Sequence, residues 1–240
     1  SEFSKEYTKG LQDHGMIATA KHFPGHGDTQ TDSHSSLAMI PSDSTRLWSL
    51  ELKPFASMAD AGVDVVMVAH VHAPDYQPEA DDPATLSPFW VTDVLKGRLG
   101  FDGAIITDGM GMGGITKNYS DDYAIVKAVQ AGCHIIIQNY DMVGSIDAIE
   151  KAVLDGEISE QQINSSALKM LELKYKVGLN LNPYVGLDLM MRNISTKGNR
   201  ETSNRIASEA ITLVKDSKGL LPINASPRDT LYIIDIYDQE

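Results

Sequence analysis

The segment Val63-Asp64-Val65-Val66-Met67-Val68 decides the fold class of this 240-residue chain. It is apolar at almost every position and does not alternate between apolar and polar residues. This pattern is typical of a parallel strand covered on both faces, because a strand with one exposed face alternates. With its continuation it spans residues 63–71, and similar runs occupy residues 16–23, 103–108 and 133–138. The four runs predict four buried parallel strands.

Helical segments separate these strands. Pro54 near the start and Gly62 just past the end mark a helix over residues 53–62, and Ser87-Pro88 begins a second helix. A third helix begins at Asp121 and stops at Gly132. Further helices are predicted at residues 146–154, 159–178 and 201–211. The repeated order of strand, loop and helix favours an α/β fold with a parallel sheet or barrel.

The composition excludes several classes of protein. Hydrophobic residues make up 42% and charged residues 22% of the chain, which are ordinary globular values. The 20 Lys and Arg against 33 Asp and Glu give a net charge of −13, so nucleic acid and anionic membranes are unfavourable partners. The single cysteine, Cys133, cannot form an internal disulfide. No apolar run reaches the ~20 residues of a membrane helix. The first residues resemble no signal peptide, and localisation stays open between the bacterial cytoplasm and an exported or cell-surface site.

Histidines concentrate where the first two predicted strands end. Five of the seven histidines lie there: His22, His26, His34, His70 and His72. Functional side chains of parallel α/β folds gather at the carboxyl ends of the strands. A single histidine in such a place more often bonds a loop carbonyl than takes part in catalysis. Five of them at two strand ends favour an active site.

Two carboxylates fit chemically beside these histidines. Asp32 lies two residues before His34, and a carboxylate at an imidazole fixes the orientation of the ring and stabilises its protonated form. Such a ring suits a group that gives a proton to a leaving group and later takes one back. Asp108 ends an otherwise apolar strand and is a candidate nucleophile. That Asp108 only caps the next turn is an equally weighted alternative.

A glycine-rich segment, residues 109–114, follows Asp108. It lacks both a following Lys-Ser/Thr and an acidic residue about twenty positions on, so a nucleotide-binding loop is not favoured. We expect its glycines to let the backbone pass close to a substrate or to a neighbouring loop.

The pair His70 and His72 leaves a metal site open as an alternative. Two positions apart on one strand, they share a face and have a spacing seen in metal ligands. A metal-dependent TIM-barrel hydrolase is therefore a second hypothesis, which bound zinc would support.

Beyond these patterns, the segment Lys21-His22-Phe23-Pro24-Gly25-His26-Gly27-Asp28, followed by Asp32-Ser33-His34, resembles the signature of the family 3 glycoside hydrolases. The similarity is to their bacterial β-N-acetylglucosaminidase (β-hexosaminidase) branch. Similar segments follow in the same order at residues 69–71, 83–87, 100–108 and 161–164. Residues 207–222 resemble the passage into the family's C-terminal α/β domain.

The resemblance implies a retaining exo-β-N-acetylglucosaminidase that needs no cofactor and no metal. Its substrates would carry terminal N-acetylglucosamine, as cell-wall muropeptides and chitooligosaccharides do. Asp108 would form a covalent glycosyl-enzyme, and His34, held by Asp32, would act as acid and then as base. Phosphate could compete with water as acceptor, because a neutral histidine repels an anion less than a carboxylate does. The implied substrate-binding residues are Lys21, His22, His70 and Met112.

The chain also departs from the family pattern. Gly109, Met110 and Gly111 precede the matching Met112 where the branch usually has larger or polar residues, which affects the loop near the leaving group. The first four strands of the family's (β/α)8 TIM barrel are absent. We therefore expect residues 1–178 to form the C-terminal half of a TIM barrel, about four βα units. Residues 179–200 are expected to be a linker. Residues 201–240 are expected to start a second α/β domain, with a strand at residues 229–236. Such a fragment is expected to be inactive alone, and a non-catalytic sugar-binding remnant is a third hypothesis.

Overall fold

The computed structural model describes residues 2–41, 43–77, 82–137, 141–224, 226, 230 and 232. Its contacts divide the chain into two units, Ser1–Pro183 and Tyr184–Glu240. Every predicted site residue lies in the first unit, which is described first.

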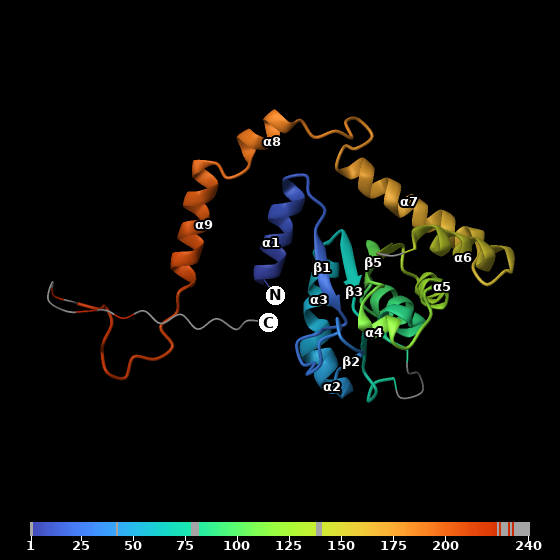
Figure 1. Cartoon of the computed structure of the whole chain (residues 1–240), viewed down its shortest axis with the longest axis horizontal. Helices are drawn as coiled ribbons and strands as arrows, with labels where there is room; N and C mark the ends of the chain where they lie inside the picture. The colour runs from blue at the N-terminus through green and yellow to red at the C-terminus, as the bar shows by residue number, and fades with distance from the viewer. Residues whose placement is uncertain are drawn as a thin grey trace. The chain divides into compact units, whose positions relative to one another are not determined.

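The first unit contains a four-stranded parallel sheet in the order β1-β3-β5-β6 (Figure 1). The strands are β1 (Thr19–Phe23), β3 (Val65–Val68), β5 (Ala104–Gly109) and β6 (Ile135–Ile137). All three neighbouring pairs are parallel, which confirms the predicted sheet. Residue 138, the predicted end of the fourth strand, lies outside the described residues.

The second predicted strand, residues 63–71, is in fact two strands. β3 ends at Val68, and Val71–His72 forms strand β4, which pairs in parallel with β2 (Ala38–Met39) in a separate small sheet. The apolar run does not show this break because residues on both sides of it are buried. One continuous strand was therefore the wrong prediction at this end.

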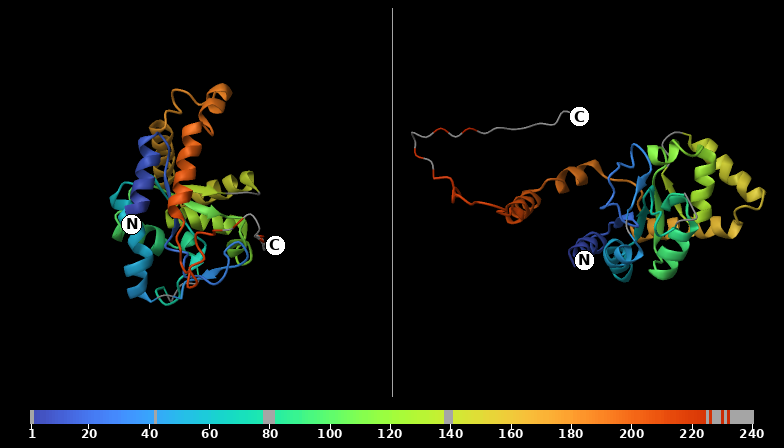
Figure 2. Two further views of the ribbon diagram at one scale, coloured as in Figure 1. Left: turned by 90° about the vertical axis from the view of Figure 1, so that its left-hand side faces the viewer. Right: turned by 90° about the horizontal axis from the view of Figure 1, so that it is seen from below.

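Helices connect the strands in the predicted order. In the first unit they are α1 (Glu2–Asp13), α2 (Ser44–Arg46), the π-helical η1 (Leu47–Glu51), α3 (Leu52–Asp60), the 3-10 turn η2 (Ala84–Leu86), the π-helical η3 (Phe89–Arg98), α4 (Gly113–Thr116), α5 (Asp121–Ala131), α6 (Met142–Leu154) and α7 (Glu160–Lys176). Gly132 ends α5 with a left-handed φ of 111°, as its position in the sequence predicted. Helices α5 and α6 pack together at the β6 end of the sheet (Figures 1 and 2).

The helix predicted over residues 53–62 begins earlier than expected. Helical turns run from Ser44, where the Asp43 side chain accepts a hydrogen bond from the backbone N–H of Arg46, so Asp43 is the N-cap and Pro54 lies inside the helical run. A proline inside a helix donates no hydrogen bond and crowds the carbonyl four residues before it. That residue, Leu50, lies in the wide π-helical turn η1. Taking Pro54 as a start signal was wrong because the preceding turn is not a regular α-helix.

The main core lies between one face of the sheet and the helices. Phe23 packs edge-on against Phe55 and Trp90, with ring centroids 5.3 and 6.1 Å apart. Val66 and Ile105 belong to this core, whereas Met67 and Ile106, which alternate with them, are only half-buried. Within the described residues, helices thus cover one face of the sheet more completely than the other.

The second unit contains α8 (Leu187–Asn193) and α9 (Lys197–Ala210). Helix α8 and the start of α9 fall in residues 179–200, which we expected to be free of helix. No residue of either helix is buried. Helix α9 confirms the helix predicted at residues 201–211 and begins four residues earlier. Helix α8 has only seven residues, which is shorter than the stretch over which a helical period can be recognised. The strand predicted at residues 229–236 falls almost entirely outside the described residues. No helix in the described parts of the chain is both long and apolar enough to cross a membrane.

Candidate active site

The carboxyl ends of β1 and β5 bring a histidine and a carboxylate together. Nε2 of His22, on β1, lies 3.8 Å from Oδ2 of Asp108, on β5. Strand β3 runs between these two strands, so both side chains reach over the same edge of the sheet. The sheet therefore places Asp108 at a strand end next to another predicted site residue.

Asp108 is held in a largely buried position. Its side chain is 20% exposed, and its Oδ1 accepts a 2.8 Å hydrogen bond from the backbone N–H of Gly109. Burial lowers the pKa of His22 below its ordinary value, although the charge of Asp108 opposes this. A neutral His22 leaves the Asp108 carboxylate without a full counter-charge from this ring.

Asp32 and His34 form a close pair on the loop after β1. Oδ1 of Asp32 lies 2.7 Å from Nδ1 of His34 and also accepts a 2.9 Å hydrogen bond from the backbone N–H of His34. These two bonds, the backbone bond foremost, hold the pKa of Asp32 below its usual range. An ionised carboxylate only accepts, so Nδ1 of His34 carries the proton and Nε2 is left for proton exchange. The side chains are 66% and 76% exposed.

Two sets of contacts hold the loop that carries this pair. Nε2 of His26 lies 2.9 Å from the Ser33 hydroxyl, and the Thr29 hydroxyl lies 2.7 Å from Nδ1 of His26. From the opposite side, the backbone N–H groups of Gly113 and Gly114 donate to the carbonyls of His34 and Ser33, at 3.0 and 3.1 Å. The loop after Asp108 is thus joined directly to the loop of Asp32 and His34.

The glycines in this contact have the predicted role. A Cβ on Gly113 would lie 2.5 Å from the Ser35 carbonyl oxygen, and one on Gly114 would lie 3.2 Å from both the Ser33 carbonyl oxygen and Cβ of His70. The close approach of the glycine segment to a neighbouring loop is confirmed for these two positions.

His70 lies beneath the same site and not at its surface. Its side chain is fully buried. Nδ1 lies 2.9 Å from the Thr85 hydroxyl, and Nε2 lies 3.0 Å from the carbonyl oxygen of Gly109. Both ring nitrogens therefore contact protein groups, and the structure presents neither of them to a substrate.

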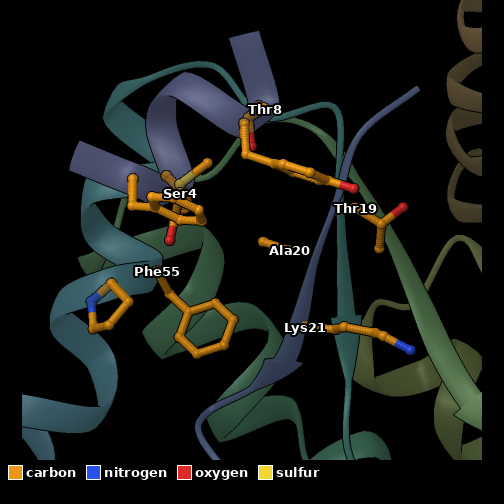
Figure 3. Close-up of a pocket in the computed structure, with 10 residues that line it drawn as sticks. Ser4, Thr8, Thr19, Ala20, Lys21 and Phe55 are labelled. Atoms are coloured by element: carbon orange, nitrogen blue, oxygen red, sulfur yellow. The ribbon is translucent and has the colours of Figure 1, made fainter. Parts of the chain in front are cut away.

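Lys21 and Met112 directly precede residues of the site, Lys21 before His22 on β1 and Met112 before Gly113. Lys21 is exposed on β1 and lines one end of a cavity of about 370 Å³ between α1, β1 and α3 (Figure 3). Figure 3 shows its ammonium group extending away from the apolar side of that cavity, where Phe55 lies. Met112 is half-buried at the N-terminal end of α4, and its backbone N–H donates to the Gly109 carbonyl at 3.0 Å.

The geometry gives little support to a metal centre at His70 and His72. His72 lies on β4, which belongs to the small second sheet, and its buried Nδ1 has no hydrogen-bond partner in the described part of the chain. Both nitrogens of His70 already contact Thr85 and Gly109. Among the residues that the structure describes, no three His, Cys, Asp or Glu side chains gather closely enough to hold a metal ion.

Two residues that shape the site escaped prediction from the residues alone. Thr85 contacts His70, and Ser33 joins His26 to the loop of His34. Hydroxyl residues are common in loops, so neither stands out by type. Their only sequence signal was a place within the segments that resemble the glycoside hydrolases.

Comparison with known proteins identifies the family of the chain. Residues 1–173 match the sequence profile of the glycosyl hydrolase family 3 N-terminal domain. A β-hexosaminidase of Psychromonas ingrahamii is 32% identical over 181 residues, which make up 75% of this chain and 52% of that relative. A solved family 3 β-N-acetylglucosaminidase from Paenibacillus sp. str. FPU-7 superposes with a TM-score of 0.80 at 39% identity, over 88% of this chain and 40% of that one.

A protein of a different activity is also similar. A solved β-glucoside phosphorylase has a TM-score of 0.84 and 26% identity, over 91% of this chain and 41% of that one. The chain spans about half the length of the curated relatives it matches, 42%, 52% and 53% for the first three. The chain belongs to glycosyl hydrolase family 3, and its parallel sheet corresponds to part of that family's N-terminal (β/α) barrel domain.

Proposed function

We propose that this chain carries the catalytic groups of a retaining exo-β-N-acetylglucosaminidase that acts on terminal β-linked N-acetylglucosamine of muropeptides or chitooligosaccharides. The observation that supports it most is the pairing of Asp32 with Nδ1 of His34, which leaves Nε2 for proton transfer on a loop tied to the one after Asp108. The similarity to β-hexosaminidases supports the choice of sugar.

In the first step, a carboxylate oxygen of Asp108 attacks the anomeric carbon. The bond from that carbon to the leaving-group oxygen breaks, and protonated His34 gives its Nε2 proton to that oxygen. Asp32 stabilises the imidazolium and fixes which nitrogen carries the transferred proton, as a carboxylate does in other catalytic His–Asp pairs. The product of this step is a glycosyl ester of Asp108.

In the second step, Nε2 of the now neutral His34 takes a proton from water. The water oxygen attacks the anomeric carbon from the opposite face, and the ester bond to Asp108 breaks. Two inversions give net retention. Lys21 and His22 would bond hydroxyls of the terminal sugar, and Met112 would contact the bound sugar. Neither step requires a metal or a cofactor.

The same proposal covers the architecture beyond the observed sheet. Residues 1–178 would be the C-terminal half of a (β/α)8 TIM barrel, residues 179–200 a connection, and residues 201–240 the start of a second α/β domain. Since the chain spans about half of its relatives' length, we also propose that it is inactive alone.

The test compares the isolated chain with a longer protein in which the first half of the barrel precedes this chain. Release of 4-nitrophenol from 4-nitrophenyl N-acetyl-β-glucosaminide is expected from the longer protein only. Proton NMR of the first-formed sugar is expected to show the β anomer. Formation of the α anomer would refute retention, and hydrolysis by the isolated chain would refute its inactivity.

Transfer to phosphate is a second candidate activity. It is supported by the similarity to the β-glucoside phosphorylase and by a histidine in place of a carboxylic acid as acid and base. Products of the longer protein with and without phosphate distinguish the two activities. If no glycosyl phosphate forms under any condition, transfer to phosphate is excluded.

A further inference from the structure

His70 is placed to control the backbone next to Asp108. Its ring nitrogens lie between the Thr85 hydroxyl and the carbonyl of Gly109, at 2.9 and 3.0 Å. Gly109 directly follows Asp108, and its N–H donates to the Asp108 carboxylate at 2.8 Å. The buried ring therefore contacts the carbonyl of Gly109, and the N–H of the same residue contacts the Asp108 carboxylate.

The contact with the Gly109 carbonyl selects one tautomer of His70. A carbonyl oxygen only accepts, so Nε2 must carry a proton and donate to Gly109. Burial lowers the pKa of His70 below its ordinary value, although the Gly109 bond and the charge of Asp108 oppose this, so the ring is neutral near pH 7. Nδ1 is then unprotonated and shares the single hydroxyl proton of Thr85 with the Ala69 carbonyl, which lies 2.8 Å from the same oxygen. These acceptors, together with the Val68 carbonyl at 3.2 Å, fix the position of the Thr85 hydroxyl beside the ring.

Gly109 is also the start of the segment that holds the second half of the site. From Gly109 the chain continues to Gly113 and Gly114, whose N–H groups donate to the carbonyls of His34 and Ser33. The N–H of Met110 donates to the Ile137 carbonyl at 2.9 Å, which ties the same segment to β6. The bond from His70 thus anchors the segment at the end nearest Asp108.

We propose that His70, oriented by Thr85, is a positioning residue that fixes the 109–114 segment, and through it sets Asp108 relative to the Asp32–His34 pair. It acts through Gly109 and does not bind the substrate. This inference rests on the proposed function for its catalytic consequence, but its structural part is measurable without any activity.

The structural test uses the 240-residue chain with Thr85→Val, which keeps the shape of the side chain and removes the hydroxyl. Thr85→Ser, which keeps the hydroxyl, is the matched control. Hydrogen-exchange mass spectrometry is expected to show at least about tenfold faster exchange in residues 109–114 for Thr85→Val and wild-type exchange for Thr85→Ser. Amides of α7 should be unchanged in both variants, which separates a local effect from general unfolding. Unchanged exchange in residues 109–114 would overturn the proposal, whatever the enzyme does.

A measurement on the wild-type chain does not depend on whether a variant folds. Long-range proton–nitrogen correlation NMR of the imidazole rings is expected to show His70 as the neutral tautomer with its proton on Nε2. A proton on Nδ1 alone would overturn the proposal, because Nε2 could then not donate to Gly109.

The catalytic test uses the same two substitutions in the longer protein. A carboxylate displaced by a fraction of an ångström should lower kcat by about 10- to 100-fold, with KM changed less than about threefold, for Thr85→Val only. A loss confined to KM would instead assign His70 to substrate binding and overturn the positioning role. If wild type shows no glycosidase activity, the proposed function fails while the exchange and NMR results still decide the role of His70.

Discussion

The two halves of the site are held in different ways. Asp108 stands at the end of a sheet strand, 20% exposed, with a buried histidine contacting the residue after it. Asp32 and His34 stand on a loop, 66% and 76% exposed, and no strand carries them. The sheet positions the first half, and hydrogen bonds between two loops position the second.

The difference suits the two chemical roles that we propose. A nucleophile that forms a covalent bond must meet one carbon atom at a fixed distance, which a strand end ensures. A group that gives a proton in one step and takes one from water in the next must reach both the leaving group and solvent, so exposure serves it. Removing each half in turn should therefore have different consequences.

The largest effect is expected at the sheet half. Asp108→Ala in the longer protein should lower kcat by at least about 10⁵-fold, because no other group can form the glycosyl ester. Azide at high concentration should restore turnover by attacking the anomeric carbon directly, and NMR should identify the product as the α-glycosyl azide. Undiminished hydrolysis by Asp108→Ala would support the hypothesis of a non-catalytic sugar-binding remnant.

The loop half should show a smaller effect that depends on the leaving group. His34→Ala should lower kcat/KM about 10²- to 10⁴-fold for a poor leaving group, because its oxygen departs without a proton. The loss should be much smaller for 2,4-dinitrophenyl N-acetyl-β-glucosaminide, whose leaving group needs no proton. Asp108→Ala should impair both substrates alike. Equal losses for both substrates with His34→Ala would contradict its role as acid.

The fold was predictable where burial leaves a pattern. The β5 run and the α5 end at Gly132 were visible because apolar runs and a left-handed glycine have direct physical causes. The strand segments are apolar on both faces, although Ile106 is only half-buried in this structure. The N-terminal domain of glycosyl hydrolase family 3 is a (β/α) barrel, and both faces of a barrel strand are covered. Helix α8 was missed because its seven residues are too few for a helical period to be recognised.

The site was predictable by residue type but not by contact. Asp108, Asp32 and His34 stood out because carboxylates and imidazoles at strand ends are chemically distinctive. The contacts of His70 could not be foreseen, because one of its partners, Thr85, is fifteen positions away in sequence but bonded to His70 in the fold. His70 also lies between β3, which ends at Val68, and β4, a break that the continuous apolar run conceals.

The stability of the sheet half can be tested by a tight packing position beside β5. A Cβ on Gly103 would lie 2.4 Å from Cζ of Phe101 and 2.5 Å from the Asp64 carbonyl oxygen. Gly103→Ala should therefore lower the free energy of unfolding by about 1–3 kcal/mol, measured by urea denaturation. Gly10→Ala is the control, since a Cβ there meets nothing within 4 Å and alanine favours its helix α1. Equal stability of the two variants would mean that the start of β5 is loosely packed, and the contrast between the halves would weaken.

The smallest effect is expected from an ion pair of the loop half. Nη2 of Arg46 lies 3.2 Å from Oδ2 of Asp28, and both side chains are partly exposed, so water screens the attraction. Asp28→Asn, which leaves in place the second ion pair of Arg46 with the mostly buried Glu51, should change the free energy of unfolding by less than about 1 kcal/mol and leave kcat unchanged. The loop would then depend on the bonds from His26, Gly113 and Gly114. A large, salt-sensitive loss of kcat would instead show that charge holds the loop, and that the exposed half depends on solution conditions in a way that the strand-held Asp108 does not.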